Sequence, residues 1–157
     1  MLQHAPRRST RHLLVMALIM GSSMPAAFAD GAWRSDDLER LTSANDFHVV
    51  PYRDDHVTLG KPARILAVAV DGELYVRAQE GERSSWYRAA LRERGGQITA
   101  AGLTRMVAFE RVQGEINGQI DAAYRARYAT SPMLNSMISE RANATTVRIK
   151  PLGSPPK

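Results

Sequence analysis

Residues 60–92 read GKPARILAVAVDGELYVRAQEGERSSWYRAALR, and this stretch decides the fold. It begins with a basic turn, and the residues that follow are apolar without alternation, which is typical of a strand covered on both faces. Asp71-Gly72 comes next and is the strongest short hairpin signal in the chain. We therefore expect strands over 65–70 and 73–78, with Leu74 and Val76 facing the core.

The same stretch ends in an amphipathic helix, which we predict over 86–94. Ser84 or Ser85 is placed to cap its first turn, because serine oxygens accept hydrogen bonds from the free N–H groups of a helix start. Gly95-Gly96 follows the last apolar position and is expected to stop the helix. The order of basic turn, hairpin and helix is therefore expected to form one unit.

Downstream, alternating residues around Ala101-Gly102 predict a second hairpin in which Val107 and Phe109 face inward. Apolar residues at helical spacing predict a helix that lies against the sheet, and Pro132 suits the first turn of another. The further segments that we expect are strands over 47–50, 97–100, 105–112 and 145–150, helices over 115–129 and 132–141, and a short helix capped by Ser35. These elements indicate an α+β fold with a mostly antiparallel, split-barrel-like sheet and helices packed against it.

The first 29 residues have the features of a signal peptide. Arg7, Arg8 and Arg11 precede an apolar run over 13–20, and Ala27-Phe28-Ala29 offers the small-x-small pattern that signal peptidase accepts. We expect cleavage after Ala29 and an exported protein, periplasmic or secreted, with the general secretory and twin-arginine routes both open. Residues 30–151 are then expected to form a single domain, and residues 152–157 a flexible tail.

The composition limits the partners of the chain. It holds 21 Lys and Arg against 16 Asp and Glu, and removal of the three leader arginines leaves 18 against 16, a net charge of +2. These charges are interspersed, so the basic patch typical of nucleic-acid binders is missing. Cysteine is absent, which excludes disulfides and thiolate chemistry. We expect a small-molecule ligand, with a homodimer as an open alternative, and neither nucleic acid nor, after leader cleavage, a membrane.

Several side chains are candidates for ligand binding, each with a simpler alternative. Lys61 and Arg64 suit a phosphate, because a guanidinium binds two oxygens at once, but both also fit solvated loop positions. Trp86 and Tyr87 suit stacking on a flat ring or burial in the core. Arg88 and Arg92 share one helix face, which suits an anion or plain solvent exposure. A fourth set has Asp121 paired with Arg125 and flanked by two tyrosines on one helix face: Tyr124 and Tyr128. This set suits the wall of a pocket, or a structural role in which the tyrosines bury their rings against the sheet and hydrogen-bond their hydroxyls.

Potential metal ligands gather in one part of the chain, but their spacing matches no compact zinc motif. They are Asp46, His48, Asp54, Asp55 and His56. The acids among them are explained equally well as turn formers, so we assign no metal site. With no Cys and no Gly-x-Ser-x-Gly elbow, nucleophilic catalysis has no candidate, and the catalytic residues, if there are any, stay unknown.

The mature chain resembles an uncharacterised bacterial family, domain of unknown function 2255, over nearly all of its length. That resemblance implies a fold without an established activity. It rests on the combination of Trp33, Asp36-Asp37-Leu38, Phe47-His48-Val49-Val50-Pro51, Asp54-Asp55, Leu74-Tyr75-Val76-Arg77, Trp86-Tyr87-Arg88-Ala89-Ala90-Leu91, Ile120-Asp121-Ala122-Ala123-Tyr124-Arg125, Tyr128 and Ala144-Thr145-Thr146-Val147.

Gly60–Arg92 also resembles the core of the flavin- and deazaflavin-dependent split-barrel oxidoreductases. The resemblance implies an FMN-type flavin or a deazaflavin, with phosphate on the basic turn and the cofactor beside the start of the helix. Pro62-Ala63 stands where those enzymes usually repeat a glycine. Carried over by position, the cofactor-binding residues are Lys61, Arg64, Ser84, Ser85 and Trp86. Two functions therefore stay open: an oxidoreductase-like protein that binds such a cofactor, and a non-enzymatic periplasmic module that binds a small ligand or has a structural role.

Overall fold

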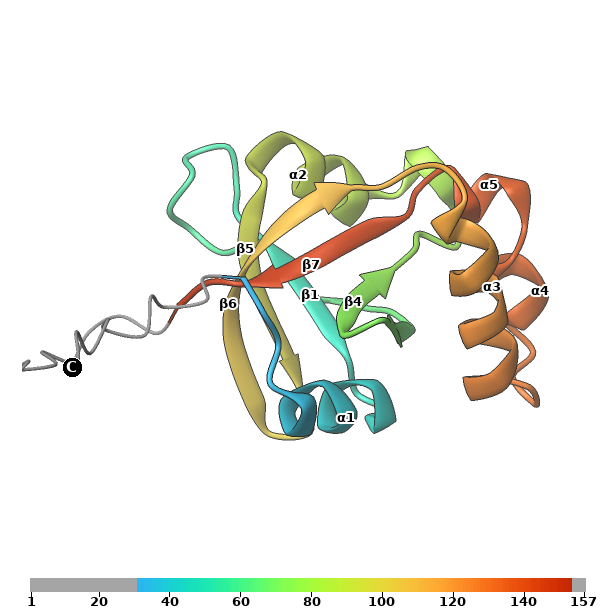
Figure 1. Ribbon diagram of the computed structural model, residues 1–157. Helices are drawn as coiled ribbons and strands as arrows, with labels where there is room; N and C mark the ends of the chain where they lie inside the picture. Colours follow the sequence, from blue (N-terminus) through green and yellow to red (C-terminus); the bar gives the residue numbers. More distant parts are fainter. Residues whose placement is uncertain (1–30, 154–157) are drawn as a thin grey trace, which may run out of the picture.

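The computed structural model describes residues 31–153, so the expected leader and most of the expected tail lie outside the described part. Within it the chain forms an α+β fold around one curled, half-barrel sheet (Figure 1). All seven strands of this sheet pair antiparallel, in the order β2-β1-β5-β6-β7-β4-β3. Their bounds are β1 (His48–Pro51), β2 (Ala63–Arg64), β3 (Ala67–Val70), β4 (Glu73–Val76), β5 (Gly95–Ala100), β6 (Leu103–Arg111) and β7 (Val147–Pro151). The predicted fold class is confirmed.

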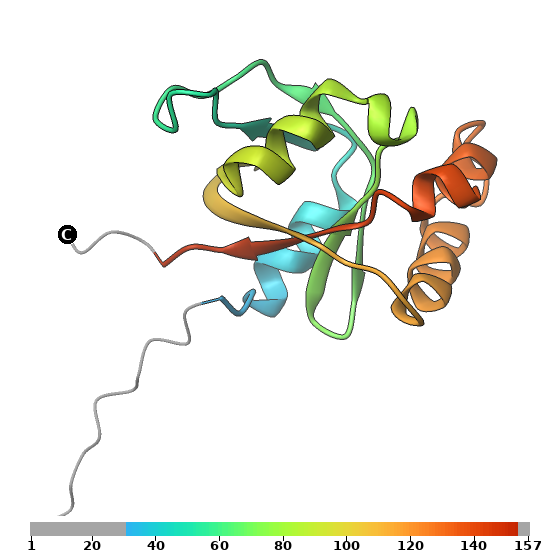
Figure 2. The same cartoon turned by 90° about the horizontal axis from the view of Figure 1, so that it is seen from above.

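The helices are distributed around this curl (Figures 1 and 2). They are α1 (Ser35–Ser43), α2 (Ser85–Glu93), α3 (Ile116–Arg127), α4 (Leu134–Met137) and α5 (Glu140–Asn143), with a 3₁₀ turn at Gly81–Arg83. In Figure 1, α1 and α2 lie at opposite ends of the curl, while α3, α4 and α5 form a separate group beside the hairpin of β3 and β4. No helix in the described residues has both the length and the apolar character needed to cross a bilayer.

The hairpin of β3 and β4 is confirmed, and its two faces pack into different cores. Asp71 and Gly72 both have positive φ, at 50° and 77°, as the two central residues of a type I′ turn require. Leu74 and Val76 pack inside the curl, in a cluster that also holds apolar residues of α1 and α2. Tyr75 faces the other way, into a cluster formed with α3 and α4. This double burial explains why the strands are apolar on both faces.

The strand expected over 65–70 begins only at Ala67, and a separate short strand precedes it, which corrects the prediction. Ala63–Arg64 pairs with β1 as β2, whereas Ala67–Val70 pairs with β4 as β3. These are the two edge strands of the sheet, and they are consecutive in the chain. Ile65-Leu66 therefore carries the chain from one edge to the other across the open side of the half-barrel, and we call these two residues the seam. Their apolar character resembles that of a strand, so the sequence pattern did not show the break.

The second hairpin is confirmed as β5 and β6, but the reason for the preceding glycines is different from the expected one. Helix α2 ends at Arg94, which adopts the left-handed conformation with φ of 56° and donates its N–H to Ala90 O. Gly95 and Gly96 already belong to β5. A Cβ atom on Gly96 would lie 2.4 Å from Val50 O, so this glycine permits the close approach of β1 rather than ending a helix.

Three helix details also differ from the predictions. Ser35 is the first helical residue of α1 and not its cap, and Ser84 holds the cap position of α2 without a side-chain capping bond. The helix expected over 132–141 is two short helices, because Ser139 adopts an extended conformation between them. Its Oγ accepts a hydrogen bond from Ala142 N at 3.3 Å and so starts α5.

A buried arginine joins the sheet to the helical group. Arg77 follows β4, exposes none of its surface, and donates to Asp121 Oδ1 at 2.5 Å and to Thr146 Oγ1 at 3.0 Å. Its Nη2 also donates to Asn117 Oδ1 at 2.8 Å. The possible pairing of Asp121 with Arg125 is therefore not the one that forms, because the buried guanidinium of Arg77 needs a carboxylate more than an exposed one does.

Candidate functional site

The basic turn and helix α2 border a cavity that we call the turn cavity. This turn cavity has a volume of about 630 Å³. Segment 51–54 after β1, segment 60–63 before β2, and one face of α2 form its walls. It is lined by Pro51, Tyr52, Arg53, Asp54, Gly60, Lys61, Pro62, Ala63, Ser85, Trp86, Ala89 and Arg92.

Helix α2 divides its residues between the core and the turn cavity. Ser85, Ala89 and Arg92 follow the i, i+4, i+7 spacing of one helix face and line the cavity. Trp86 and Ala90 belong to the core inside the curl, and only 9% of the Trp86 surface remains exposed. The core alternative for Trp86 is therefore correct for most of the indole, and its remaining edge contributes to the cavity wall.

The charges around the turn cavity are mostly positive. Arg53, Lys61 and Arg92 reach it from three different segments, and Asp54 is the one acid among the residues that line it. Arg92 Nε also donates to Glu93 Oε1 at 2.5 Å, and this hydrogen bond is the main cause of a lowered pKa for Glu93. The cavity thus combines three cations with the aromatic side chains of Tyr52 and Trp86, a donor set suited to an anionic group beside a flat ring.

The loop over 53–58, which we call the rim loop, contributes Arg53 and Asp54 to this cavity and is ordered by its own hydrogen bonds. Asp55 Oδ1 accepts from the backbone N–H groups of Val57 at 3.0 Å and Thr58 at 2.8 Å. A hydrogen bond from the Thr58 side chain and these two backbone bonds lower the pKa of Asp55 to about 2. His56 Nδ1 contacts the Glu93 carboxylate and so connects the loop to the end of α2.

The structure divides the predicted cofactor-binding residues between two cavities. Lys61, Ser85 and Trp86 line the turn cavity. Ser84 and Arg64 lie instead with Trp86 at a neighbouring cavity of about 200 Å³. The Arg64 guanidinium donates through Nε and Nη2 to Asn45 O, at 3.1 and 2.6 Å, which holds it away from Lys61. Sequence reasoning missed Arg53, because a single arginine in a polar loop gives no signal of its own.

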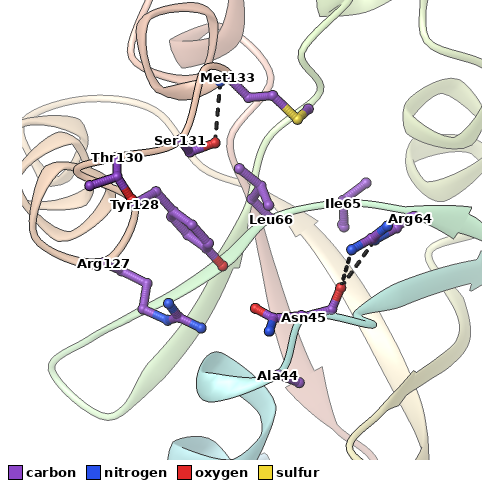
Figure 3. A pocket seen from close by; sticks show the side chains of 10 residues that line it. All are labelled: Ala44, Asn45, Arg64, Ile65, Leu66, Arg127, Tyr128, Thr130, Ser131 and Met133. Atoms are coloured by element: carbon purple, nitrogen blue, oxygen red, sulfur yellow. Dashed lines mark hydrogen bonds between the residues drawn. The ribbon is translucent and has the colours of Figure 1, made fainter.

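A third cavity, of about 440 Å³, opens beside the seam (Figure 3). This seam cavity shares no lining residue with the turn cavity. It is lined by Ala44, Asn45, Arg64, Ile65, Leu66, Arg127, Tyr128, Thr130, Ser131 and Met133. Its residues come from the end of α1, the seam, and the end of α3 with the turn that follows.

The tyrosines of α3 mainly hold the helix against the sheet. Tyr124 OH donates to Leu66 O and Tyr128 OH donates to Ala67 O, each at 2.9 Å. Burial raises the pKa of both phenols, so they remain protonated donors at neutral pH. The structural alternative is thus correct for Tyr124, whereas Tyr128 also lines the seam cavity.

The candidate metal ligands lie in separate interactions. Asp46 Oδ1 accepts from Ala101 N at 3.0 Å, and His48 Nδ1 lies 2.8 Å from Asp46 O. Asp55 and His56 belong to the rim loop described above. Within residues 31–153, no three His, Asp or Glu side chains come together in a way that would hold a metal ion.

Comparison with known proteins gives a family but no activity. A family model described as "Uncharacterized protein conserved in bacteria (DUF2255)" matches residues 37–149. The crystal structure of the conserved hypothetical protein Rv2991 from Mycobacterium tuberculosis is similar at 16% identity, with a TM-score of 0.45, over 78% of this chain and 81% of that one. A search of curated proteins found no match.

Proposed function

Because this chain belongs to the DUF2255 family of uncharacterised bacterial proteins, we propose its function from the geometry of its own cavities: it is an exported protein that binds a phosphorylated, flavin-type ligand in the turn cavity. Export rests on the charge and apolar pattern of residues 1–29. An intact-mass measurement of the protein from the exported fraction tests it, with a mature chain that begins at Asp30 as the expected result.

One observation carries the ligand proposal, namely that three cations and two aromatic side chains border a single cavity. The volume of about 630 Å³ lies within the range of roughly 300–1,000 Å³ that is typical of small-molecule sites. Lys61 and Arg53 supply donors for phosphate oxygens, and Arg92 adds positive charge from α2. Tyr52 and the edge of Trp86 supply apolar surface for a flat ring.

The side chains of this cavity bind and orient rather than react. When bound, a flavin supplies the chemistry of hydride transfer. The protein holds the flavin ring in position and controls the access of water to it. No histidine lines the turn cavity, and Asp54 is its one acid, so an acid–base pair is missing from the residues that form it. This observation favours the second candidate, a binding module for a phosphorylated ligand without catalysis.

The first experiment is a comparison of FMN with riboflavin by isothermal titration calorimetry on the mature protein. FMN is expected to bind at least tenfold more tightly, because riboflavin lacks the phosphate. Equal affinities, or no heat with either ligand, would contradict the proposal. Absorbance and native mass spectra of protein purified from its own host then show whether a flavin is carried in the cell.

Two variants locate the site. Lys61→Ala is expected to weaken FMN about tenfold, the loss of roughly one charge-assisted hydrogen bond. Arg64→Gln is the matched control, since Arg64 lies outside the turn cavity, and it should leave the affinity for FMN unchanged. If a bound flavin is never reduced by nicotinamide donors, the binding module is the better description.

A further inference from the structure

We propose that the seam cavity is a second, independent binding site, and that it takes a small carboxylate with an apolar tail. Two arginines and no acid are among the residues that line it. Neither Arg64 nor Arg127 forms an ion pair within residues 31–153. The positive charge at this cavity is therefore not balanced by any described side chain in contact with it.

Both arginines are fixed by backbone carbonyls instead of carboxylates. Arg127 donates through Nε to Thr42 O at 2.8 Å and through Nη2 to Ser43 O at 2.9 Å, at the carboxyl end of α1. Its guanidinium also lies 5.0 Å from the centre of the Tyr128 ring. These contacts order the cation without neutralising it, so an anion binds with little further loss of side-chain entropy.

The free edge of each guanidinium suits a carboxylate. In Arg64, Nε and Nη2 already share Asn45 O, which leaves Nη1 and the outer N–H of Nη2 as donors. The same two groups remain on Arg127. This outer edge is a planar pair of donors, and it matches the two oxygens of a carboxylate. Figure 3 shows Arg127 and Arg64 on opposite sides of the view with Asn45 between them, so each guanidinium offers its own outer edge to a carboxylate.

The rest of the cavity is suited to an apolar tail. Ile65, Leu66 and Met133 contribute aliphatic surface, and the Tyr128 ring forms a further part of the wall. Met133 is 37% exposed, one of the few large apolar side chains open to solvent in the described part of the chain. A ligand that is charged at one end and aliphatic at the other would cover this surface while its carboxylate meets one of the arginines.

The test compares octanoate with octan-1-ol by two-dimensional NMR titration of the mature protein. Octanoate is expected to bind at least tenfold more tightly and to shift the amides of residues 44–45, 64–66, 127–131 and 133. Equal affinities would overturn the proposal, because the arginines would then have no part in binding. The absence of shifts in these residues at millimolar octanoate would also overturn it.

Variants at an exposed position test the site without touching a hydrogen bond of the fold. Met133→Glu places a negative charge in the cavity and is expected to weaken octanoate at least tenfold, while Met133→Leu keeps the affinity. Leu152→Glu is the matched control, because Leu152 is half exposed and lies outside the seam cavity. An unchanged affinity in Met133→Glu would overturn the proposal.

The two proposed sites are tested separately by crossed variants. Arg64→Gln is expected to weaken octanoate at least fivefold and to leave FMN unchanged, whereas Lys61→Ala has the opposite pattern. If FMN fails to bind, octanoate binding still decides the seam cavity. An Arg64→Gln protein that binds octanoate as tightly as the unmodified chain overturns the role of this arginine.

Discussion

Arg77 and Asp121 form an ion pair in which Nη1 of the arginine lies 2.5 Å from Oδ1 of the aspartate, and this pair ties the end of β4 to α3. The arginine side chain exposes no surface, and that of the aspartate is 17% exposed. Thr146, which precedes β7, accepts from the same guanidinium and donates to Asn117 Oδ1 at 2.6 Å. A polar network therefore holds α3 where its tyrosines reach the seam.

Removing the acid from this pair is expected to be strongly destabilising. Asp121→Ala leaves the Arg77 charge buried without its carboxylate, and we expect the free energy of unfolding to fall by about 3 kcal/mol. Urea denaturation followed by circular dichroism measures it. Asp37→Ala is the control, since the pair of Asp37 with Arg105 is partly exposed, and its loss should cost less than about 1 kcal/mol. Similar losses of stability in both variants would show that the network around Arg77 contributes little to the free energy of unfolding.

Two buried tyrosines are expected to respond differently to loss of the hydroxyl group. Tyr124→Phe removes the bond to Leu66 O and should lower the free energy of unfolding by about 1 kcal/mol. The Tyr87 hydroxyl is buried and has no hydrogen-bond partner within residues 31–153. Tyr87→Phe should therefore leave the stability unchanged within about 0.5 kcal/mol or raise it. Thermal unfolding of both variants checks the difference, and a larger loss in Tyr87→Phe would disprove it.

Two glycines, one in the first hairpin turn and one in α3, offer a matched pair of substitutions. Gly72 has φ of +77°, where an L-residue is strained, so Gly72→Ala should cost about 1 kcal/mol or more. Gly118 lies within α3, and a Cβ atom there would meet nothing within 4 Å. Gly118→Ala should instead stabilise the protein by about 0.5–1 kcal/mol, because alanine favours the helix. Chemical denaturation gives both values, and the prediction fails if they share a sign.

The rim loop is expected to depend on pH through Asp55. The folded pKa of about 2 is below the ordinary value of 3.8, so its contribution to stability is present above about pH 4 and is lost as pH falls through 2. Carboxyl NMR titration should locate this pKa directly. Thr58→Val should raise it by removing the hydroxyl donor, whereas Thr42→Val, in α1, should not. A pKa near 3.8 in the unmodified protein would show that the loop does not hold the carboxylate.

The local patterns of the sequence were sufficient for most elements of the fold. The first hairpin turn follows from Asp71-Gly72, a pair that tolerates positive φ, and the second hairpin follows from alternation around Ala101-Gly102. The core face of α2 follows from spacing alone. The break at Ile65-Leu66 could not be predicted in this way, because these two residues are as apolar as the strand that follows them, and the strands on either side of the break differ in which strand they pair with. Of the residues predicted to bind a cofactor, Lys61, Ser85 and Trp86 line one cavity, whereas Arg64 lies at others.

The sequence by itself determined the turns, the helix faces and the apolar content of the strands, because these depend on backbone preferences and on spacing along a few neighbouring residues. Only the tertiary structure decided which partners the charged side chains contact. Arg77 pairs with Asp121, which is 44 positions away in the chain, and Arg127 donates to the backbone oxygen of Thr42, which is 85 positions away. The two cavities likewise combine side chains from separate elements, because the curl of the sheet brings distant parts of the chain together, and no local pattern encodes that proximity.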